Sequence, residues 1–100
     1  MTETTTKTFP LGQIVATQGV MATVPHARRI ECLARHARGD WGVISDEDEG
    51  LNDEALEQGN RILSVYSISP IQPSTNRKNR FWIITEADRS VTTLLLPDEY

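Results

Sequence analysis

The last quarter of the chain constrains the fold most, because two strand-like runs flank a short polar break there. The runs cover residues 81–86 and 91–96 and are rich in aromatic, aliphatic and threonine side chains, whereas residues 87–90 are mostly polar. This pattern is typical of an antiparallel hairpin. Because the first run carries Phe81 and Trp82, we expect the rest of the chain to pack on this hairpin.

The length and composition of the chain predict one small domain. A chain of 100 residues can hide about two thirds of its unfolded surface, which suffices for one core. Hydrophobic residues make up 38% of the chain, below the roughly 45–50% that is usual in globular domains. We therefore expect a thin core, with one sheet and helices on one face. Residues 1–8 are rich in threonine and predict a flexible tail, which leaves residues 9–100 as the domain.

The first clear helix signal begins at Thr23. Thr23 is a suitable N-cap, Pro25 suits the first turn, and Gly39 is a natural left-handed stop. Apolar side chains at helical spacing predict the buried stripe of this helix, namely Ala27, Ile30, Leu33, Ala34 and Ala37. His36 lies at the edge of this stripe, and Cys32 lies one position off it, so we expect a half-buried, unreactive thiol.

A second helix is expected over residues 46–58. Ser45 followed by several acids resembles a capping box, and Gly59 is the expected stop. The helix has a thin apolar face, which consists of Leu51, Ala55 and Leu56.

Further segments complete the predicted fold. Residues 11–16 form a predicted edge strand beside the hairpin, and Thr17 is expected to cap a helical turn over 18–22. Residues 61–68 alternate as a strand, and residues 69–79 predict a long exposed hairpin loop. One face of this strand carries Ile62, Ser64, Tyr66 and Ile68. The predicted fold class is α+β, with two N-terminal helices packed on a three- to four-stranded antiparallel sheet in the order β-α-α-β-β-β.

The formal net charge of −4 is concentrated in one segment, since residues 46–57 carry seven carboxylates and no base. An acidic total argues against a dedicated non-specific nucleic-acid binder, because attraction to phosphate needs a positive field. The acids lack the alternating Asp and Asn pattern and the central Gly of a calcium loop, so we expect no metal site and no cofactor. They are typical of a solvated helix face whose first turn complements the helix dipole.

The cysteine count and the hydropathy of the chain predict a cytoplasmic protein without a membrane partner. Cys32 is the single cysteine, which excludes an internal disulfide and fits a reducing compartment. No apolar run approaches the ~20 residues of a membrane span. Residues 1–8 contain no apolar core of a secretory signal.

A series of polar and aromatic motifs runs along almost the whole chain after residue 8. They are residues 11–17, Arg35-His36, residues 39–42, Gly59-x-Arg61-x-x-Ser64-x-Tyr66, residues 82–90, Thr92-Thr93 and Leu95-Leu96-Pro97-x-x-Tyr100. Together they resemble a family of small proteins carried by bacterial plasmids, phages and other mobile elements. Members are labelled plasmid-related proteins or, in some cases, subunit M of a type I restriction system.

The resemblance implies a mobile-element setting and leaves the activity open. We expect a host or plasmid-encoded protein as the partner. The restriction label does not fit the residues. A methyltransferase of that type needs a Gly-rich cofactor turn and an Asn/Asp-Pro-Pro-aromatic loop, and neither motif is present.

If the first helix packs over the sheet, the polar residues of these motifs are expected to converge. They are His36, Asp40, Asn52, Arg61, Ser64, Tyr66, Thr85, Glu86, Asp88, Arg89 and Thr93. Small microbial ribonucleases with helices followed by an antiparallel sheet use such a set. In this alternative function, His36 and Glu86 are acid and base, and Arg61 or Arg89 neutralises the phosphate of an RNA substrate.

A structural interpretation of the same residues competes with the catalytic one. Asp88 and Ser90 would shape the hairpin turn, and Arg89 would pair with Glu86 or with an acid of the second helix. His36 would pack at a helix end.

The leading hypothesis is a non-enzymatic accessory protein that binds another macromolecule through its acidic helix. In this hypothesis a phosphate-like surface faces a host-defence or plasmid-maintenance protein, and it consists of Asp46, Glu47, Asp48 and Glu49. Further candidate binding residues are Asp40, Trp41, Asn52, Tyr66 and Asp88. Trp41 has two interpretations. It fills a gap between helix and sheet while Asp40 accepts nearby backbone N–H groups, or both residues line a pocket beside His36.

Overall fold

A computed structural model describes residues 9–72 and 77–100 of the chain. The predicted tail over residues 1–8 therefore lies outside the described residues, as does part of the predicted loop over 69–79. The elements follow in the order β1 (Gln13–Ala16), α1 (Gln18–Thr23), α2 (His26–Ala37), α3 (Asp46–Gln58), β2 (Ile62–Ser67), η1 (Arg77–Asn79), β3 (Arg80–Thr85), β4 (Val91–Leu95) and η2 (Pro97–Glu99). The α+β class is confirmed, and α1 adds a short helix where the sequence predicted one helical turn.

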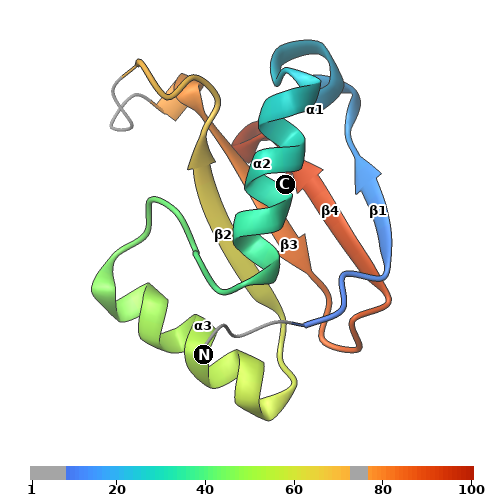
Figure 1. Cartoon of the computed structure of the whole chain (residues 1–100), viewed down its shortest axis with the longest axis vertical. Coiled ribbons are helices and arrows are strands. Elements are labelled where there is room, and N and C mark those ends of the chain that lie inside the picture. The colour runs from blue at the N-terminus through green and yellow to red at the C-terminus, as the bar shows by residue number, and fades with distance from the viewer. Residues whose placement is uncertain (1–8, 73–76) are drawn as a thin grey trace, which may run out of the picture.

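The described strands form one sheet in the order β1-β4-β3-β2 (Figure 1). The predicted hairpin is present as β3 and β4, and β2 pairs antiparallel with β3 on its other side. β1 lies at the edge beside β4, as predicted, but the two strands run parallel. The sheet is therefore mixed rather than wholly antiparallel. Helices separate β1 from its partner in sequence, so the alternation of side chains along β1 carried no information about its direction.

The hairpin turn takes its shape from Asp88 and Ser90, as the structural interpretation predicted. The Asp88 carboxylate accepts hydrogen bonds from the Ser90 backbone N–H at 3.0 Å and from its hydroxyl at 2.6 Å. These bonds hold the pKa of Asp88 below its usual value. Between them, Arg89 adopts a left-handed backbone with φ of 62°.

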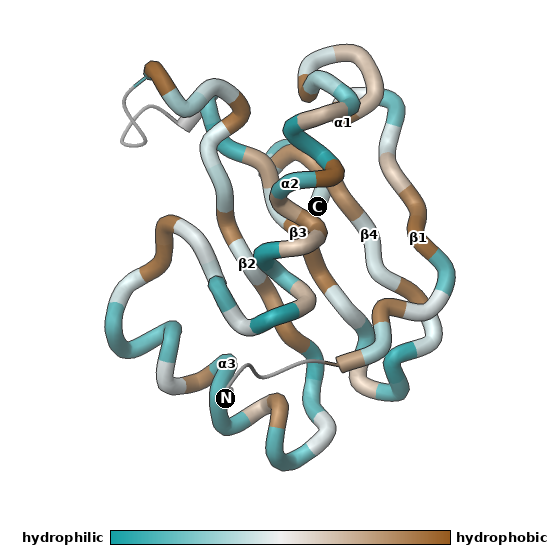
Figure 2. The backbone as a smooth tube through the Cα atoms, in the orientation of Figure 1, coloured by the Kyte–Doolittle hydropathy of each residue, from teal (hydrophilic) through white to brown (hydrophobic). Residues whose placement is uncertain are grey.

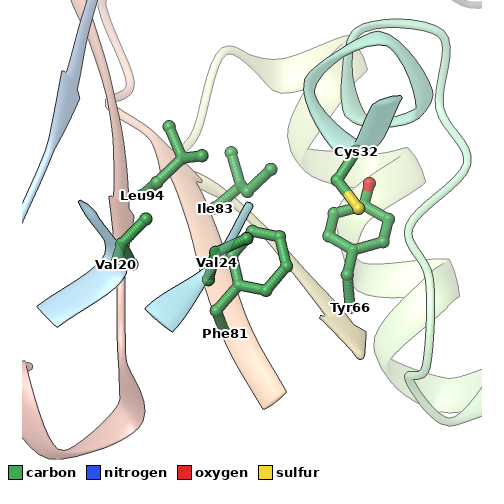
Figure 3. Packing of buried hydrophobic residues seen from close by; sticks show 7 residues of the cluster. All are labelled: Val20, Val24, Cys32, Tyr66, Phe81, Ile83 and Leu94. Atoms are coloured by element: carbon green, nitrogen blue, oxygen red, sulfur yellow. The ribbon is translucent and has the colours of Figure 1, made fainter. Parts of the chain in front are cut away.

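Helices α1 and α2 lie over one face of the sheet, with α3 beside β2 (Figure 1). The core between these layers is a cluster of buried side chains (Figure 3), namely Val20, Val24, Cys32, Tyr66, Phe81, Ile83 and Leu94. A second cluster under α3 contains Trp41, Ala55 and Ile62. The two clusters together give the thin core that the composition predicted.

The predicted buried stripe of α2 is wrong at three of its five positions, while Leu33 packs against the core and Ala37 is half-buried. Ala27, Ile30 and Ala34 are exposed, whereas Cys32 and His36 have no exposed surface. Alanines contribute little to burial on either face, so their spacing was weak evidence. The helix instead turns His36 towards hydroxyl groups of the sheet. Burial raises the pKa of the Cys32 thiol to about 11, so the thiol is unreactive as expected but fully rather than half buried.

Most predicted helix ends agree with the structure. The Thr17 hydroxyl caps α1 by accepting from the Val20 N–H, and Ser45 caps α3 in the same way. α3 ends at Gly59, whose φ of 74° is left-handed. The expected cap at Thr23 is wrong, because its hydroxyl donates to a carbonyl of α1 and Pro25 occupies the N-cap position of α2 without a side-chain bond.

The outer edge of β2 is closed by three parts of the chain. The side-chain amide of Asn52 bonds both the N–H and the C=O of Leu63, at 3.3 and 2.6 Å. Residues 41–43 bond both backbone groups of Val65, and the Arg28 guanidinium donates to the carbonyl of Ser67. β2 therefore presents a sheet edge whose outward backbone groups are largely satisfied.

Within residues 9–72 and 77–100, every helix is too short or too polar to cross a membrane.

Candidate functional site

A hydrogen-bonded chain of polar side chains runs through the interior at the position where the sequence predicted a catalytic cluster. His36, in the last turn of α2, contacts Ser64 of β2 through Nδ1 at 2.5 Å and Thr85 of β3 through Nε2 at 2.8 Å. Thr85 contacts Thr92 of β4 at 2.7 Å, and Thr92 donates to the carbonyl of Leu11 at 2.7 Å. These hydrogen bonds therefore link α2 to three strands, β2, β3 and β4, and to the segment before β1.

The hydrogen bond from Thr92 to Leu11 determines which group donates and which accepts in each of the other hydrogen bonds. A carbonyl only accepts, so the Thr92 hydroxyl proton points to Leu11 and the Thr92 oxygen accepts from Thr85. The Thr85 oxygen then accepts from His36, which places the imidazole proton on Nε2. The unprotonated Nδ1 accepts in turn from the Ser64 hydroxyl. A neutral imidazole with its proton on Nε2 therefore satisfies all of these hydrogen bonds.

Burial keeps His36 neutral. Loss of hydration, together with a smaller effect of the positive charge of Arg89, lowers the pKa of the imidazole to about 3. The side chains of His36 and Ser64 have no exposed surface. A ribonuclease acid or base must contact its substrate, so the imidazole is out of reach of RNA in this conformation. The arrangement positions α2 on the sheet.

The other proposed catalytic residues gather at the hairpin turn. Arg61 contacts the Glu86 carboxylate at 3.4 Å and donates to the Tyr100 hydroxyl at 2.7 Å on an exposed surface. Arg89 donates to backbone carbonyls instead, at 2.7 Å to Asn60, 3.0 Å to Glu86 and 3.3 Å to Ala55. The guanidinium thus joins the turn to the C-terminal end of α3, where a positive charge complements the helix dipole.

Phe9 lies against both His36 and Arg89. Its ring centroid is 5.3 Å from that of the imidazole and 5.7 Å from the Arg89 guanidinium carbon. Phe9 also contacts the ring of Trp41. The Phe9 ring therefore lies between the buried hydrogen-bonded side chains and the charged hairpin turn. His36 does not share a cleft with Arg61 and Glu86.

Asp40 and Trp41 form packing contacts rather than a pocket wall. Trp41 is buried between α3 and β2, and its indole N–H donates to Asp53 at 3.1 Å. The Asp40 carboxylate binds the Arg35 guanidinium at 2.8 Å, which holds its pKa below the usual value. The carbonyl of Asp40 accepts from the Tyr66 hydroxyl at 2.6 Å. Trp41 thus has the packing role that was the first of its two interpretations from the sequence.

The remaining predicted binding residues divide between structure and surface. Asn52 is buried and closes the edge of β2, Asp88 shapes the turn, and Thr93 lies on the face of the sheet away from α2. The four acids at the start of α3 are all exposed, namely Asp46, Glu47, Asp48 and Glu49.

Sequence reasoning missed Thr92 and Arg35, which complete the interactions of His36 and Asp40. A signal for a buried polar network was present, although it did not point to Thr92 itself. Ser64 was expected to share a face with large apolar side chains, and a hydroxyl at such a position requires a buried partner. The hairpin register that places Thr92 opposite Thr85 was not available from the sequence alone.

Among residues 9–72 and 77–100, no three histidine, cysteine or acidic side chains are grouped as ligands for a metal ion. Comparison of the chain with protein-family models, with curated proteins and with solved structures gave no match.

Proposed function

We propose that this protein is a macromolecule-binding accessory module that binds a basic protein surface through α3. The observation that carries the proposal is the unpaired negative charge of six carboxylates of this helix. Its exposed carboxylates have no ion pair with any residue in the described ranges, and they are Asp46, Glu47, Asp48, Glu49, Glu54 and Glu57.

Folding alone does not account for this charge pattern. Acids in the first turn of a helix complement its dipole, but Glu54 and Glu57 lie in the second half, where negative charge is unfavourable. Glu54 and Glu57, three positions apart, are also neighbours on the helix surface, and such a like-charge pair destabilises a helix by roughly 0.2–0.5 kcal/mol. A positively charged partner would remove both penalties.

The position of α3 suits such a partner. The helix lies beside β2 at one end of the molecule, and its exposed side is mostly hydrophilic (Figures 1 and 2). Leu51 is 57% exposed between the carboxylates, contrary to its predicted place on the buried face. A hollow of about 520 Å³ lies along the same helix, bordered by Gly50, Asp53, Glu54, Leu56, Glu57 and Gln58. An apolar side chain among acids favours a protein over a simple cation as the ligand.

Basic protein surfaces commonly bind the phosphates of nucleic acids, so an acidic helix competes with nucleic acid for them. In the mobile-element setting that the resemblance implies, such a partner would be a host-defence or plasmid-maintenance protein.

The test is affinity capture from a bacterial host lysate with two variants, one that removes four charges from α3 and one that removes two charges elsewhere. The first variant replaces the acids at 46–49 by Asn and Gln, and the control carries Glu31→Gln and Asp98→Asn. The proposal expects a basic protein that binds the wild type and the control, is lost from the first variant, and is displaced by added nucleic acid. Capture that is identical for both variants would contradict it.

A further inference from the structure

The two edges of the sheet differ in their backbone hydrogen bonding. β2 is closed by Asn52, residues 41–43 and Arg28, as described above. In β1, the N–H of Gln13 donates to Ser90 at 2.9 Å and the N–H of Thr17 donates to Leu94 at 3.0 Å. Alternate residues of a strand direct their backbone groups to opposite sides.

The backbone groups of Ile14 and Ala16 therefore point away from β4. Within residues 9–72 and 77–100, neither residue makes a hydrogen bond to a turn, a loop or a side chain, and the register with β4 directs their backbone groups outward. β1 is the open edge of the sheet.

The segment around β1 also lacks the charges that usually protect an open edge. Residues 9–25 contain no Asp, Glu, Lys, Arg or His, although such side chains are frequent in the rest of the chain. Ile14 is 49% exposed and Val15 is 41% exposed, on opposite faces of the strand. Figure 2 shows this apolar stretch along β1. Edge strands that avoid pairing commonly carry a charged side chain, often Lys, and β1 has none.

We propose that β1 pairs antiparallel with β1 of a second copy of this chain, around a two-fold axis at Val15. The distribution of charge favours this edge over the acidic surfaces as the place where two copies meet. A chain with a net charge of −4 repels its own copy wherever acidic surfaces meet. β1 is uncharged and lies at the end of the sheet opposite β2 and α3 (Figure 1). Pairing through β1 therefore extends the sheet and keeps the two acidic helices at its far ends.

The two-fold geometry pairs each outward group with a complementary one. With Val15 opposite Val15 of the second copy, Ile14 lies opposite Ala16 on both sides of the axis. Each Ile14–Ala16 pair exchanges N–H···O bonds, and the central Val15 pair is the closely spaced, non-hydrogen-bonded kind, with Cα atoms ~4.5 Å apart. Such an isologous contact closes on itself. Because the paired strand is short, the interface is small and the dimer is weak.

Sedimentation of the full chain from micromolar to millimolar concentration tests the pairing. The wild type is expected to shift towards twice the 11.2 kDa of the monomer, and Val15→Lys, which sets two like charges face to face, is expected to remain a monomer. Circular dichroism and thermal unfolding verify that the lysine variant is folded. A wild type that stays monomeric at millimolar concentration would overturn the proposal and leave the edge to a strand of another protein. Dimerisation unaffected by Val15→Lys would overturn it too.

A disulfide tests the register. The expected Cα separation suits a disulfide bond, so Val15→Cys should crosslink at least ~10-fold faster than Val43→Cys, because pairing raises the local thiol concentration. Val43 is a matched control, since it is 38% exposed and lies beside the closed β2 edge. The native Cys32 is buried and does not interfere. Equal crosslinking rates would overturn the register through Val15. This inference is independent of the function proposed for α3.

Discussion

The Nε2 atom of His36 donates a hydrogen bond to the hydroxyl of Thr85 across 2.8 Å, in a part of the interior with no exposed surface. This contact joins α2 to β3 and fixes the tautomer of the imidazole. It also explains why the polar residues of the sequence motifs are structural. The buried ones, His36, Ser64, Thr85 and Thr92, satisfy one another inside the protein, where an unsatisfied polar group costs about 1–3 kcal/mol.

Thr85→Val is expected to destabilise the protein. The substitution keeps the shape of the side chain but leaves the Nε2 proton of His36 without an acceptor, so the free energy of unfolding should fall by about 1–3 kcal/mol. Chemical denaturation measures this loss. Thr93→Val is the matched control, because Thr93 is only half-buried on the opposite face of the sheet. An equal effect of both substitutions would mean that the hydrogen bond between His36 and Thr85 contributes nothing to stability.

The stability of the protein is expected to fall as the pH drops below about 6.5. The pKa of His36 is about 3 in the folded protein against a usual value of 6.5. Between these values the unfolded chain binds a proton that the folded protein does not, so the free energy of unfolding decreases by up to about 1.4 kcal/mol per pH unit.

The range from pH 6.5 to 5 isolates this effect of His36. The carboxylates of Asp40 and Glu99 have lowered pKa values, from usual values of 3.8 and 4.5, so they contribute only at lower pH. Urea unfolding at several pH values provides the measurement. His36→Gln should abolish the slope in this range, and a slope that persists in this variant would assign the effect to other groups.

Gly50 within α3 and Gly59 at its end should respond in opposite directions to replacement by alanine. A Cβ at Gly50 meets no atom within 4 Å, so Gly50→Ala should stabilise the helix by about 0.5–1 kcal/mol. Gly59 has equal space but a φ of 74°, so Gly59→Ala should destabilise the protein by roughly 1–2 kcal/mol. Thermal unfolding of both variants compares them directly. Stabilisation by both would show that α3 does not end in a left-handed residue.

Arg89 is expected to contribute more to stability than Arg61. Arg89→Ala removes the hydrogen bonds that join the turn to α3, and a loss of about 1.5–3 kcal/mol is expected for bonds from a charged donor. Arg61→Ala breaks an exposed ion pair and should change stability by less than about 1 kcal/mol. Denaturant titrations measure both changes. A larger loss for Arg61→Ala than for Arg89→Ala would mean that the exposed pair of Arg61 and Glu86 stabilises the protein more than the contact of Arg89 with α3.

Purified protein incubated with RNA is expected to leave the RNA intact, because His36 cannot contact a substrate. Gel analysis of the RNA over time measures this, beside the variants His36→Ala and Glu86→Ala. Cleavage by the wild type that is lost in both variants would contradict the structural role of His36 and support a ribonuclease.

Several elements were predictable because their determinants are local. Ser45 and Gly59 bound α3 through bonds within a few residues, and Asp88 forms the turn through its contact with Ser90. The alternation of the last strands predicted the hairpin for the same reason. The candidate site was predicted less well. The sequence pointed to His36 as a functional residue, but its partners Ser64 and Thr85 lie 28 and 49 positions away.

The sequence by itself determined the α+β class, the hairpin, the acidic helix and most of the helix ends, since each depends on neighbours along the chain. Only the tertiary structure decided the parallel direction of β1, the buried face of α2 and the interior position of His36. The physical reason is that a polar side chain can be buried only where distant segments supply its hydrogen bonds, and those segments meet only when the chain folds.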